Sequence, residues 1–292
     1  MSKPPSVIAT LATIDAIQDL HLLLISLSIF NTNPPIVYLY CDDEVAKRVP
    51  SMRYQGTLHL RRALEEYSGI PRTVQERLPG KKLPTLWSDF MAEKINLMNW
   101  AFAAGGTADG VLFCDADICF LGPLPSIPEG TLAALSPHSI RPADEARFGK
   151  YNGGFVWLSS RAMTDTWIEA CATARYFEQS ALEDVAAAAA AAGGLYEFPV
   201  TQNYGWWRLW QGVKPAKELQ NLWTMNRLKS PEHAGILVDG EPLGSVHTHF
   251  YERSDAATVA YNKWIVQWLE KLAPRHTPAK RLLSVLQRGQ RV

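Results

Sequence analysis

The residues best suited to chemistry in this sequence are two aspartates inside an apolar run. The run is Val111–Leu121 (VLFCDADICFL), with Asp115 and Asp117 at its centre. If the run forms one strand, its side chains alternate between two faces and both carboxylates point the same way. Two like charges in apolar surroundings are costly without a cation or hydrogen bonds. Because hard carboxylate oxygens suit Mn²⁺ or Mg²⁺, the pair predicts a divalent metal site. The alternative is a pair of turn carboxylates that cap a loop.

Two histidines near the end of the sequence are further candidate ligands. The segment Gly244–Phe250 (GSVHTHF) has the composition of a strand. On such a strand, His247 and His249 share one face, as a pair of metal ligands would. For each of them, a hydrogen-bonded core histidine is the alternative.

A third candidate lies between these two segments, in Tyr151–Leu158 (YNGGFVWL). The Asn152 side chain can both donate to and accept from a hydroxyl group. Gly153 and Gly154 lack a Cβ, which lets backbone and ligand approach each other closely. The simpler interpretation is a turn that precedes a strand.

The surrounding elements predict how these residues are positioned. Val7–Leu11, Ile14–Phe30 and Ile36–Cys41 have the patterns of a strand, a helix and a second strand, which form a βαβ unit. Strands and helices continue to alternate along the chain, which indicates one doubly wound α/β domain with a mostly parallel sheet. In such sheets, ligands bind beyond the carboxyl ends of the strands, where Asp115 and Asp117 are expected. The other expected helices cover residues 86–104, 161–176, 182–192 and 256–272.

The composition excludes several other classes of protein. The 292 residues are 47% hydrophobic, which is ample for a core, and the net charge of zero argues against binding nucleic acid by bulk electrostatics. The four cysteines show no CxxC spacing, so we expect free thiols rather than a disulfide framework or zinc site. The longest apolar run, Leu22–Phe30, is too short to span a bilayer, and no cleavable leader is evident. These features predict a cytoplasmic protein.

The order of the motifs resembles that of the GT-A glycosyltransferases. An apolar strand with Asp-x-Asp, followed by Asn-x-Gly at 152–154, is most similar to the family 8-like retaining enzymes that use nucleotide-sugar donors. The resemblance implies a GT-A Rossmann-like fold over residues 1–273. It also implies that Asp115-Ala116-Asp117 binds Mn²⁺ (or Mg²⁺) against the donor diphosphate. Asn152, Gly153 and Gly154 would then border the donor sugar.

The resemblance also implies residues at the reacting face of the sugar. The family carries an Asp-Gln pair on a helix, followed by a Pro, and the spacing to Pro199 selects Glu183 and Asp184. Asp184 stands where the family has Gln, and Gln179 is a competing candidate. A carboxylate there would stabilise an oxocarbenium-like transition state. Alternatively, Glu183 and Asp184 only favour the helix N-terminus through its dipole.

The family's late His-(Phe/Tyr) motif, whose imidazole completes the metal shell, matches His249 better than His247. The Lys-Pro-Trp that follows in the family is missing here, and Arg253 is a candidate cation for the diphosphate.

The donor base should lie against the ends of the first two strands. Asp42 could accept the N–H of uracil there, or cap the next helix. Lys94 could approach a phosphate, or lie on a solvated helix face. The expected contacts of the base on these strands are Thr10, Ala12, Thr13 and Asp42.

Together these features predict a metal-dependent glycosyltransferase. It would move a sugar from a UDP-sugar to a hydroxyl of a carbohydrate, glycan or glycosylated acceptor, with retention. The acceptor could stack on Trp206, Trp207 or Trp210, or these rings could be core residues. One alternative is a nucleotidyltransferase that forms nucleotide-sugars, although Leu11–Leu20 lacks the Gly-rich loop and basic residue of that class. The other is a non-enzymatic sugar-binding protein, which would not need the Asp-x-Asp.

The C-terminal residues 274–292 form a separate basic tail in this prediction. Thr277-Pro278 is a plausible helix start, with Thr277 as N-cap, and leucines at 282, 283 and 286 follow on one side. Such a helix could contact an anionic membrane surface peripherally. The alternative is that the leucines dock on the main domain.

Overall fold

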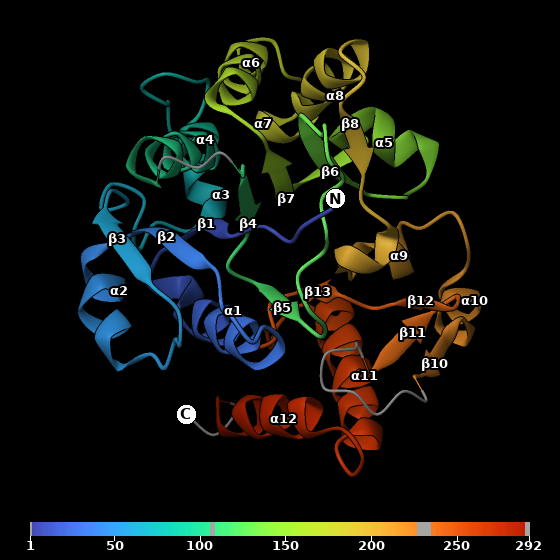
Figure 1. Ribbon diagram of the computed structural model, residues 1–292. Coiled ribbons are helices and arrows are strands. Elements are labelled where there is room, and N and C mark those ends of the chain that lie inside the picture. Colours follow the sequence, from blue (N-terminus) through green and yellow to red (C-terminus); the bar gives the residue numbers. More distant parts are fainter. Residues whose placement is uncertain (1, 106–108, 227–234, 290–292) are drawn as a thin grey trace.

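The computed structural model describes residues 2–105, 109–226 and 235–289. Its centre is a seven-stranded sheet in the order β3-β2-β1-β4-β7-β6-β8 (Figure 1). Every neighbouring pair is parallel except those of β7, which runs antiparallel to β4 and β6. The predicted mostly parallel α/β sheet is therefore confirmed. The strands are β1 (Val7–Ala12), β2 (Ile36–Cys41), β3 (Leu58–Arg62), β4 (Val111–Cys114), β6 (Ala133–Pro137), β7 (Tyr151–Leu158) and β8 (Leu195–Glu197).

Helices cover both faces of this sheet, which explains why the central strands are apolar on both sides. Each residue of β1 is buried, and its side chains alternate between two cores. Ile8 packs in the core beneath α1 (Ile17–Phe30), α11 (Ala256–Leu272) and α12 (Thr277–Gly289). Val7 and Ala9 pack in the core beneath α4 (Leu86–Gly105), α6 (Arg161–Cys171) and α8 (Leu182–Ala191).

Shorter elements connect these layers. A 3-10 turn, Ile14–Ala16, leads from β1 into α1, and two others cover Val49–Ser51 and Val200–Gln202. The short helices are α2 (Asp43–Arg48), α3 (Arg72–Gln75), α5 (Pro142–Phe148), α7 (Phe177–Ser180), α9 (Trp207–Trp210) and α10 (Ala216–Asn221).

Two small sheets complete the fold and correct one expectation. One contains β5 (Ile118–Phe120), β13 (Ser245–His247) and β9 (Tyr204–Gly205), and the other contains β10 (Trp223–Met225), β11 (Ile236–Val238) and β12 (Glu241–Pro242). The run 111–121 is not one strand, because the chain leaves the central sheet after β4 and enters the small sheet at β5. Asp115 and Asp117 therefore lie in a turn between two sheets, closed by the Ile118 N–H donating to the Asp115 carbonyl at 3.2 Å.

The basic tail forms the predicted helix, α12, which packs against α1 and α11. Leu282 and Leu286 are buried in that contact. The His276 ring, rather than Thr277, accepts the Ala279 N–H at the start of the helix (3.2 Å). Residues 290–292 lie outside the described residues, and a domain boundary at 273 stays a prediction.

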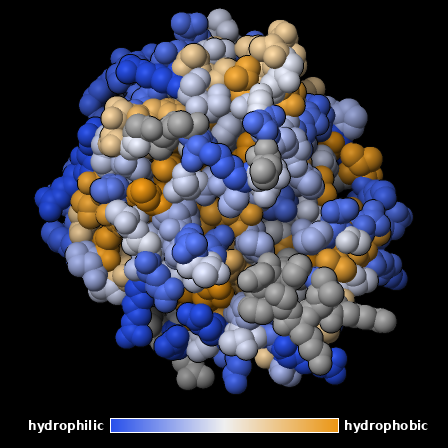
Figure 2. All heavy atoms as spheres, in the orientation of Figure 1, coloured by the Kyte–Doolittle hydropathy of each residue, from blue (hydrophilic) through white to orange (hydrophobic). Residues whose placement is uncertain are grey.

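Two predictions about the rest of the molecule also hold. All four cysteines are free and buried. Within the described ranges, each helix is too short or too polar to cross a membrane. On the face seen in Figure 2, apolar side chains are scattered among polar ones.

Candidate functional site

A cavity of about 480 Å³ lies beyond the carboxyl ends of β1 and β4. Leu11, Ala12 and Thr13 line it from the end of β1, and the Asp115–Asp117 turn lines it from the end of β4. This is the edge at which ligands bind in open α/β sheets. Its other polar lining groups are those of Asp15, Arg72, Gln75, Lys94, Tyr176, Glu178, Gln179, His247 and His249.

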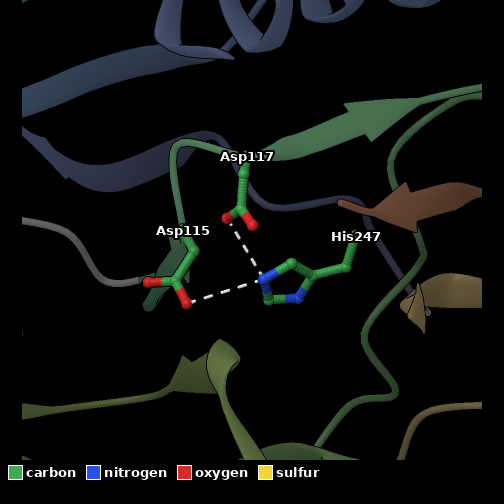
Figure 3. A group of neighbouring side chains, drawn as sticks. All are labelled: Asp115, Asp117 and His247. Carbon is green, nitrogen blue, oxygen red and sulfur yellow. Dashed lines mark ion pairs between the residues drawn. The ribbon is translucent and has the colours of Figure 1, made fainter. Parts of the chain in front are cut away.

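Three strands bring two carboxylates and one imidazole together in this cavity (Figure 3). The Asp115 N–H donates to the Gly154 carbonyl of β7 at 2.9 Å, which extends the β4–β7 ladder by one residue. In the small sheet, His247 of β13 pairs with Ile118 of β5 and so lies beside Asp117. His247 Nε2 is 3.1 Å from Asp117 Oδ1 and 3.7 Å from Asp115 Oδ2. Asp115, Asp117 and His247 each offer one ligand atom, and these three atoms lie within 4.8 Å of one another.

Gly154 is required for this convergence. A Cβ at this position would overlap Asp115 Oδ2 and lie 2.6 Å from His247 Cε1. The glycine was expected to admit a ligand, and it does line the cavity. It also admits the site's own carboxylate and imidazole to the same small volume.

The second histidine lies at the rim of this group. His249 Nε2 is 3.6 Å from Asp117 Oδ2, and its Nδ1 is 2.9 Å from Asp19 Oδ2. His249 follows β13 instead of sharing a strand face with His247, and its side chain is 59% exposed. Asp19 was missed by the sequence analysis. Its signal was an acidic residue in the first turn of a mostly apolar helix, and the structure buries it.

The electrostatics of the group favour its charged forms. Burial alone would raise the pKa of Asp117, but the charges of His247 and His249 lower it well below its usual value. The negative charge of Asp117, opposed by burial, raises the pKa of His249 to about 10, and the hydrogen bond to Asp19 adds to this effect. In this structure the histidines supply the positive charge that the carboxylates need.

The same donor set fits a divalent cation. Two carboxylates and an imidazole offer oxygen and nitrogen ligands, which suit Mn²⁺ better than Ca²⁺. Of the two histidines, His247 belongs to the compact group together with Asp115 and Asp117. His247 rather than His249 is thus the better placed imidazole, which reverses the preference of the sequence analysis.

Lys94 is buried and lies beside Asp115. Its Nζ donates to Glu178 Oε1 at 2.6 Å and to the Gly153 carbonyl at 3.2 Å, and lies 3.7 Å from Asp115 Oδ1. Burial would lower the pKa of Lys94, but the charges of Asp115 and Glu178 raise it above its usual value. The alternative of a solvated helix face is therefore wrong, and Lys94 is a buried cation that links two acids. Lys94 also lines the cavity, and its contact with a phosphate stays a prediction. A Cβ at Gly153 would approach Glu178 Oε1 to 2.7 Å, so this glycine makes room for the pair.

Glu183 and Asp184 do not line the cavity, which corrects their predicted placement. Both lie in the first turn of α8, where Glu183 pairs with Arg175 at 2.6 Å and accepts the Lys150 N–H at 3.0 Å. Asp184 is exposed. These contacts match the alternative reading, in which the pair favours a helix N-terminus.

Glu178 and Gln179 take their place at the cavity. Phe177 adopts a positive φ of 45°, and the chain there forms the separate short helix α7 before α8 begins. The acid-amide pair of α7 therefore faces the site. Gln179 was a competing candidate in the sequence, whereas Glu178 was missed because the spacing to Pro199 selected the next helix.

The residues expected around the donor base divide into two groups. Ala12 and Thr13 line the cavity, as does Ala116 of the Asp-x-Asp segment. Thr10 is fully buried, and Asp42 caps α2 by accepting the Val45 N–H at 2.8 Å. Asp42 also accepts the Ile14 N–H at 2.8 Å, so capping is its role here.

The tryptophans expected to receive the acceptor lie elsewhere. Trp207 is buried with its ring edge-on to His247 at 5.0 Å between centroids, while Trp210 is exposed. Arg253 is also exposed and is not part of the cavity wall. The aromatic residues that do line the cavity are Tyr67, Trp87, Phe90, Tyr176 and Phe177.

No protein-family model matches the sequence, and no curated protein matches it. Solved structures do. A galactosyltransferase, LgtC, in complex with donor and acceptor sugar analogues aligns with 96% of this chain and 95% of its own, at 11% identity and a TM-score of 0.52. Mouse xyloside xylosyltransferase 1 in its apo form aligns over 70% of this chain and 90% of its own (13% identity, TM-score 0.44). The apo-form glycosyltransferase GlyE of Streptococcus pneumoniae aligns over 91% of this chain and 64% of its own (15% identity, TM-score 0.49).

The alignment with the galactosyltransferase covers nearly the whole of both chains. This alignment, the strand order and the helices on both faces of the sheet show that the chain has the GT-A fold, as the order of its motifs predicted.

Proposed function

We propose that the protein is a metal-dependent glycosyltransferase that transfers a sugar from a nucleotide-sugar to an acceptor hydroxyl. The observation that carries this proposal is the convergence of Asp115, Asp117 and His247 in the cavity at the strand ends of a GT-A fold. A sugar-binding protein without activity would not need this group. A fold alone does not define an activity, so the proposal rests on the site.

Asp115, Asp117 and His247 would hold Mn²⁺ (or Mg²⁺), with His249 beside them. When bound, the metal would act as a Lewis acid that neutralises the departing diphosphate. Lys94 keeps Asp115 oriented from behind through a 3.7 Å ion pair. The second acid that Lys94 holds, Glu178, is thereby kept from acting as a free base.

The donor we propose is a UDP-sugar. Its base would lie at the end of β1, against Ala12 and Thr13, and its sugar would lie between the Asp115–Asp117 turn and Gln179. A galactosyltransferase of similar fold was solved with donor and acceptor sugar analogues, which supports a sugar donor for this fold. Retention of the anomeric configuration is part of the proposal. The neutral amide of Gln179 cannot act as the general base that an inverting transfer requires.

The acceptor we propose is a carbohydrate, a glycan or a glycosylated molecule. Trp87, Tyr176 and Phe177 line the cavity, whereas Trp206, Trp207 and Trp210 do not. Apolar sugar faces stack on such rings. The buried free thiols support a reducing, cytoplasmic location. Peripheral membrane contact by the tail gains no support, because Leu282 and Leu286 are buried against the domain.

The direct test is a donor screen in which release of UDP is measured with Mn²⁺, with Mg²⁺ and with EDTA. We expect turnover of at least one UDP-sugar that EDTA abolishes, and NMR of the first-formed product should show the anomeric configuration of the donor. Metal-independent turnover would contradict the metal assignment, and an inverted product would contradict retention. Formation of a nucleotide-sugar from a nucleoside triphosphate and a sugar phosphate would instead identify a nucleotidyltransferase.

A further inference from the structure

A row of buried polar side chains runs from the metal site into the protein interior. It begins at His247 and continues through Asn203 and Asn152 to His138. All four residues are at most 7% exposed. Asn152 was expected to border the donor sugar, but both ends of its amide are engaged by protein groups. The direction of each hydrogen bond in this row can be derived from backbone groups whose roles are fixed.

The inner end of the row is fixed by a carbonyl. His138 Nδ1 lies 3.0 Å from the Gly149 carbonyl oxygen, which can only accept. The proton of the neutral imidazole is therefore on Nδ1, and Nε2 carries a lone pair. Burial lowers the pKa of His138 to about 4, so the ring is neutral at physiological pH. Nε2 then accepts from Asn152 Nδ2 at 3.3 Å.

The middle of the row is fixed by a backbone donor. The Gly154 N–H can only donate, and it does so to Asn152 Oδ1 at 3.1 Å. This places the Asn152 oxygen toward Gly154 and its nitrogen toward His138. The Gly149 carbonyl, acting through His138, and the Gly154 N–H thus assign the same orientation to the Asn152 amide.

The directions of the hydrogen bonds at the outer end of the row, at Asn203 and His247, follow from these two assignments. Asn203 Nδ2 donates to Asn152 Oδ1 at 3.0 Å and to Ser136 Oγ at 3.1 Å. Asn203 Oδ1 is left to face His247 Nδ1 at 3.1 Å, and an amide oxygen can only accept. His247 Nδ1 therefore carries a proton whether the ring is neutral or charged, and Nε2 is the atom that faces Asp115 and Asp117.

We propose that Asn203, Asn152 and His138 are positioning residues that fix the tautomer and ring orientation of His247, so that its Nε2 lone pair is directed at the divalent metal. The proposal rests on the proposed function. Metal-binding histidines depend on such outer partners, and loss of one weakens metal affinity by about 10–100-fold. The burial of the row makes the effect strong, because no solvent replaces a lost partner. Trp207 packs edge-on against the His247 ring, which restricts it further.

Two substitutions of Asn203 separate the proposed role from general stability. Asn203→Leu keeps the approximate volume but removes the acceptor for His247 Nδ1. Asn203→Asp keeps that acceptor but loses the amide donors to Asn152 and Ser136. We expect Asn203→Leu to weaken Mn²⁺ binding by about 10–100-fold. Asn203→Asp should retain binding within a few-fold, even though its thermal stability falls.

The readout is Mn²⁺ affinity, measured by EPR of free Mn²⁺ on the full chain without donor. Thermal unfolding in EDTA verifies that each variant is folded. Ser136→Ala is the matched control, because it removes a hydrogen bond from Asn203 without changing which atom faces His247. It should bind Mn²⁺ like the wild type. With Zn²⁺ as a diamagnetic substitute, ¹⁵N–¹H spectra should show His247 protonated at Nδ1 and bound at Nε2.

The outcomes distinguish this inference from the proposed function. If the wild type binds no Mn²⁺, the metal site itself is contradicted, and the inference with it. If the wild type binds Mn²⁺ and Asn203→Leu binds it equally well, only the positioning role is overturned. Equal losses in the Leu and Asp variants would likewise overturn it, since the retained acceptor would then make no difference. A Zn²⁺ complex ligated through Nδ1 would overturn the assigned tautomer.

Discussion

Two pairs of acidic side chains in this protein look alike in the sequence and behave differently in the structure. Asp115 and Asp117 lie in the turn between β4 and β5, where strands of two sheets hold them against His247. Glu183 and Asp184 lie in the first turn of α8, where Glu183 pairs with Arg175 and Asp184 faces solvent. The fold holds the two negative charges of the first pair close together, which is costly without a positive charge beside them. The second pair is stabilised by the surface cation Arg175 and by the N-terminus of α8.

A pair of neighbouring carboxylates therefore indicates a metal or catalytic site only when the fold keeps both from full exposure to solvent, from surface cations and from helix N-termini. Substitutions in the two regions should therefore differ in their effects, and the largest difference should be in activity.

The largest effect should come from Asp117→Asn, which is nearly isosteric but removes a charged metal ligand. Loss of several kcal/mol of transition-state stabilisation corresponds to a fall in kcat/KM of about 100-fold or more. Steady-state kinetics over a range of Mn²⁺ concentrations measures it. Wild-type kcat/KM in this variant would exclude Asp117 from the metal shell.

Gly154→Ala should have an effect of similar kind without touching an ionisable group. Its Cβ would lie 2.6 Å from His247 Cε1, so the imidazole or Asp115 must move. We expect Mn²⁺ affinity to fall by at least about tenfold, since ligand geometry determines affinity. Isothermal titration with Mn²⁺ tests this, with circular dichroism verifying the fold. Unchanged affinity would mean that the ligands do not converge as described.

A buried ion pair near Asp115 and a surface ion pair at Glu183 should contribute differently to the free energy of unfolding. Lys94 and Glu178 are each 3% exposed, whereas Arg175 and Glu183 are 44% and 36% exposed. Lys94→Met leaves a buried carboxylate unpaired and should lower the free energy of unfolding by about 3–5 kcal/mol. Arg175→Met breaks a surface pair and should lower it by less than about 1 kcal/mol.

Urea unfolding measures both changes. Adding Glu178→Gln to Lys94→Met should recover part of the loss, because the carboxylate that Lys94 balanced at 2.6 Å is then neutral as well. Equal destabilisation by the Lys94 and Arg175 variants would contradict the difference between the two regions.

The smallest effect should come from Asp184→Asn, the same chemical change as Asp117→Asn in the other pair. Surface substitutions usually change free energies by no more than about 0.5 kcal/mol, or roughly twofold in rate. The two variants should be assayed side by side with the same donor. A fall in kcat for Asp184→Asn comparable to that for Asp117→Asn would return Asp184 to the reacting face.

The fold was largely predictable from the sequence. Apolar strands such as Ile36–Cys41 and helices such as Ala256–Leu272 have boundaries set by local composition, and the structure reproduces both. The change of sheet at Asp115 was not predictable, because apolar residues on both sides of the pair fit one strand as well as two. That change depends on pairing with β13, more than 120 residues later in the chain.

The candidate metal site was predictable in its two aspartates but not in its supporting groups, and the sequence motif favoured His249 over His247. Asp115, Asp117 and His247 have residue types that point to a metal. Asp19 and Glu178 acquire their roles from tertiary packing against His249 and Lys94, which no local pattern encodes. The error at Glu183 and Asp184 has a similar origin. The positive φ of Phe177 lies at the start of the short helix α7, which the spacing to Pro199 could not indicate.

The most direct test of the account is an anomalous difference map from crystals grown with Mn²⁺ and UDP. We expect one strong peak bonded to Asp115, Asp117 and His247 Nε2, in contact with the diphosphate, and none at Glu183 or Asp184. A map with bound UDP but no peak between Asp115, Asp117 and His247, or with the metal elsewhere in the cavity, would contradict it.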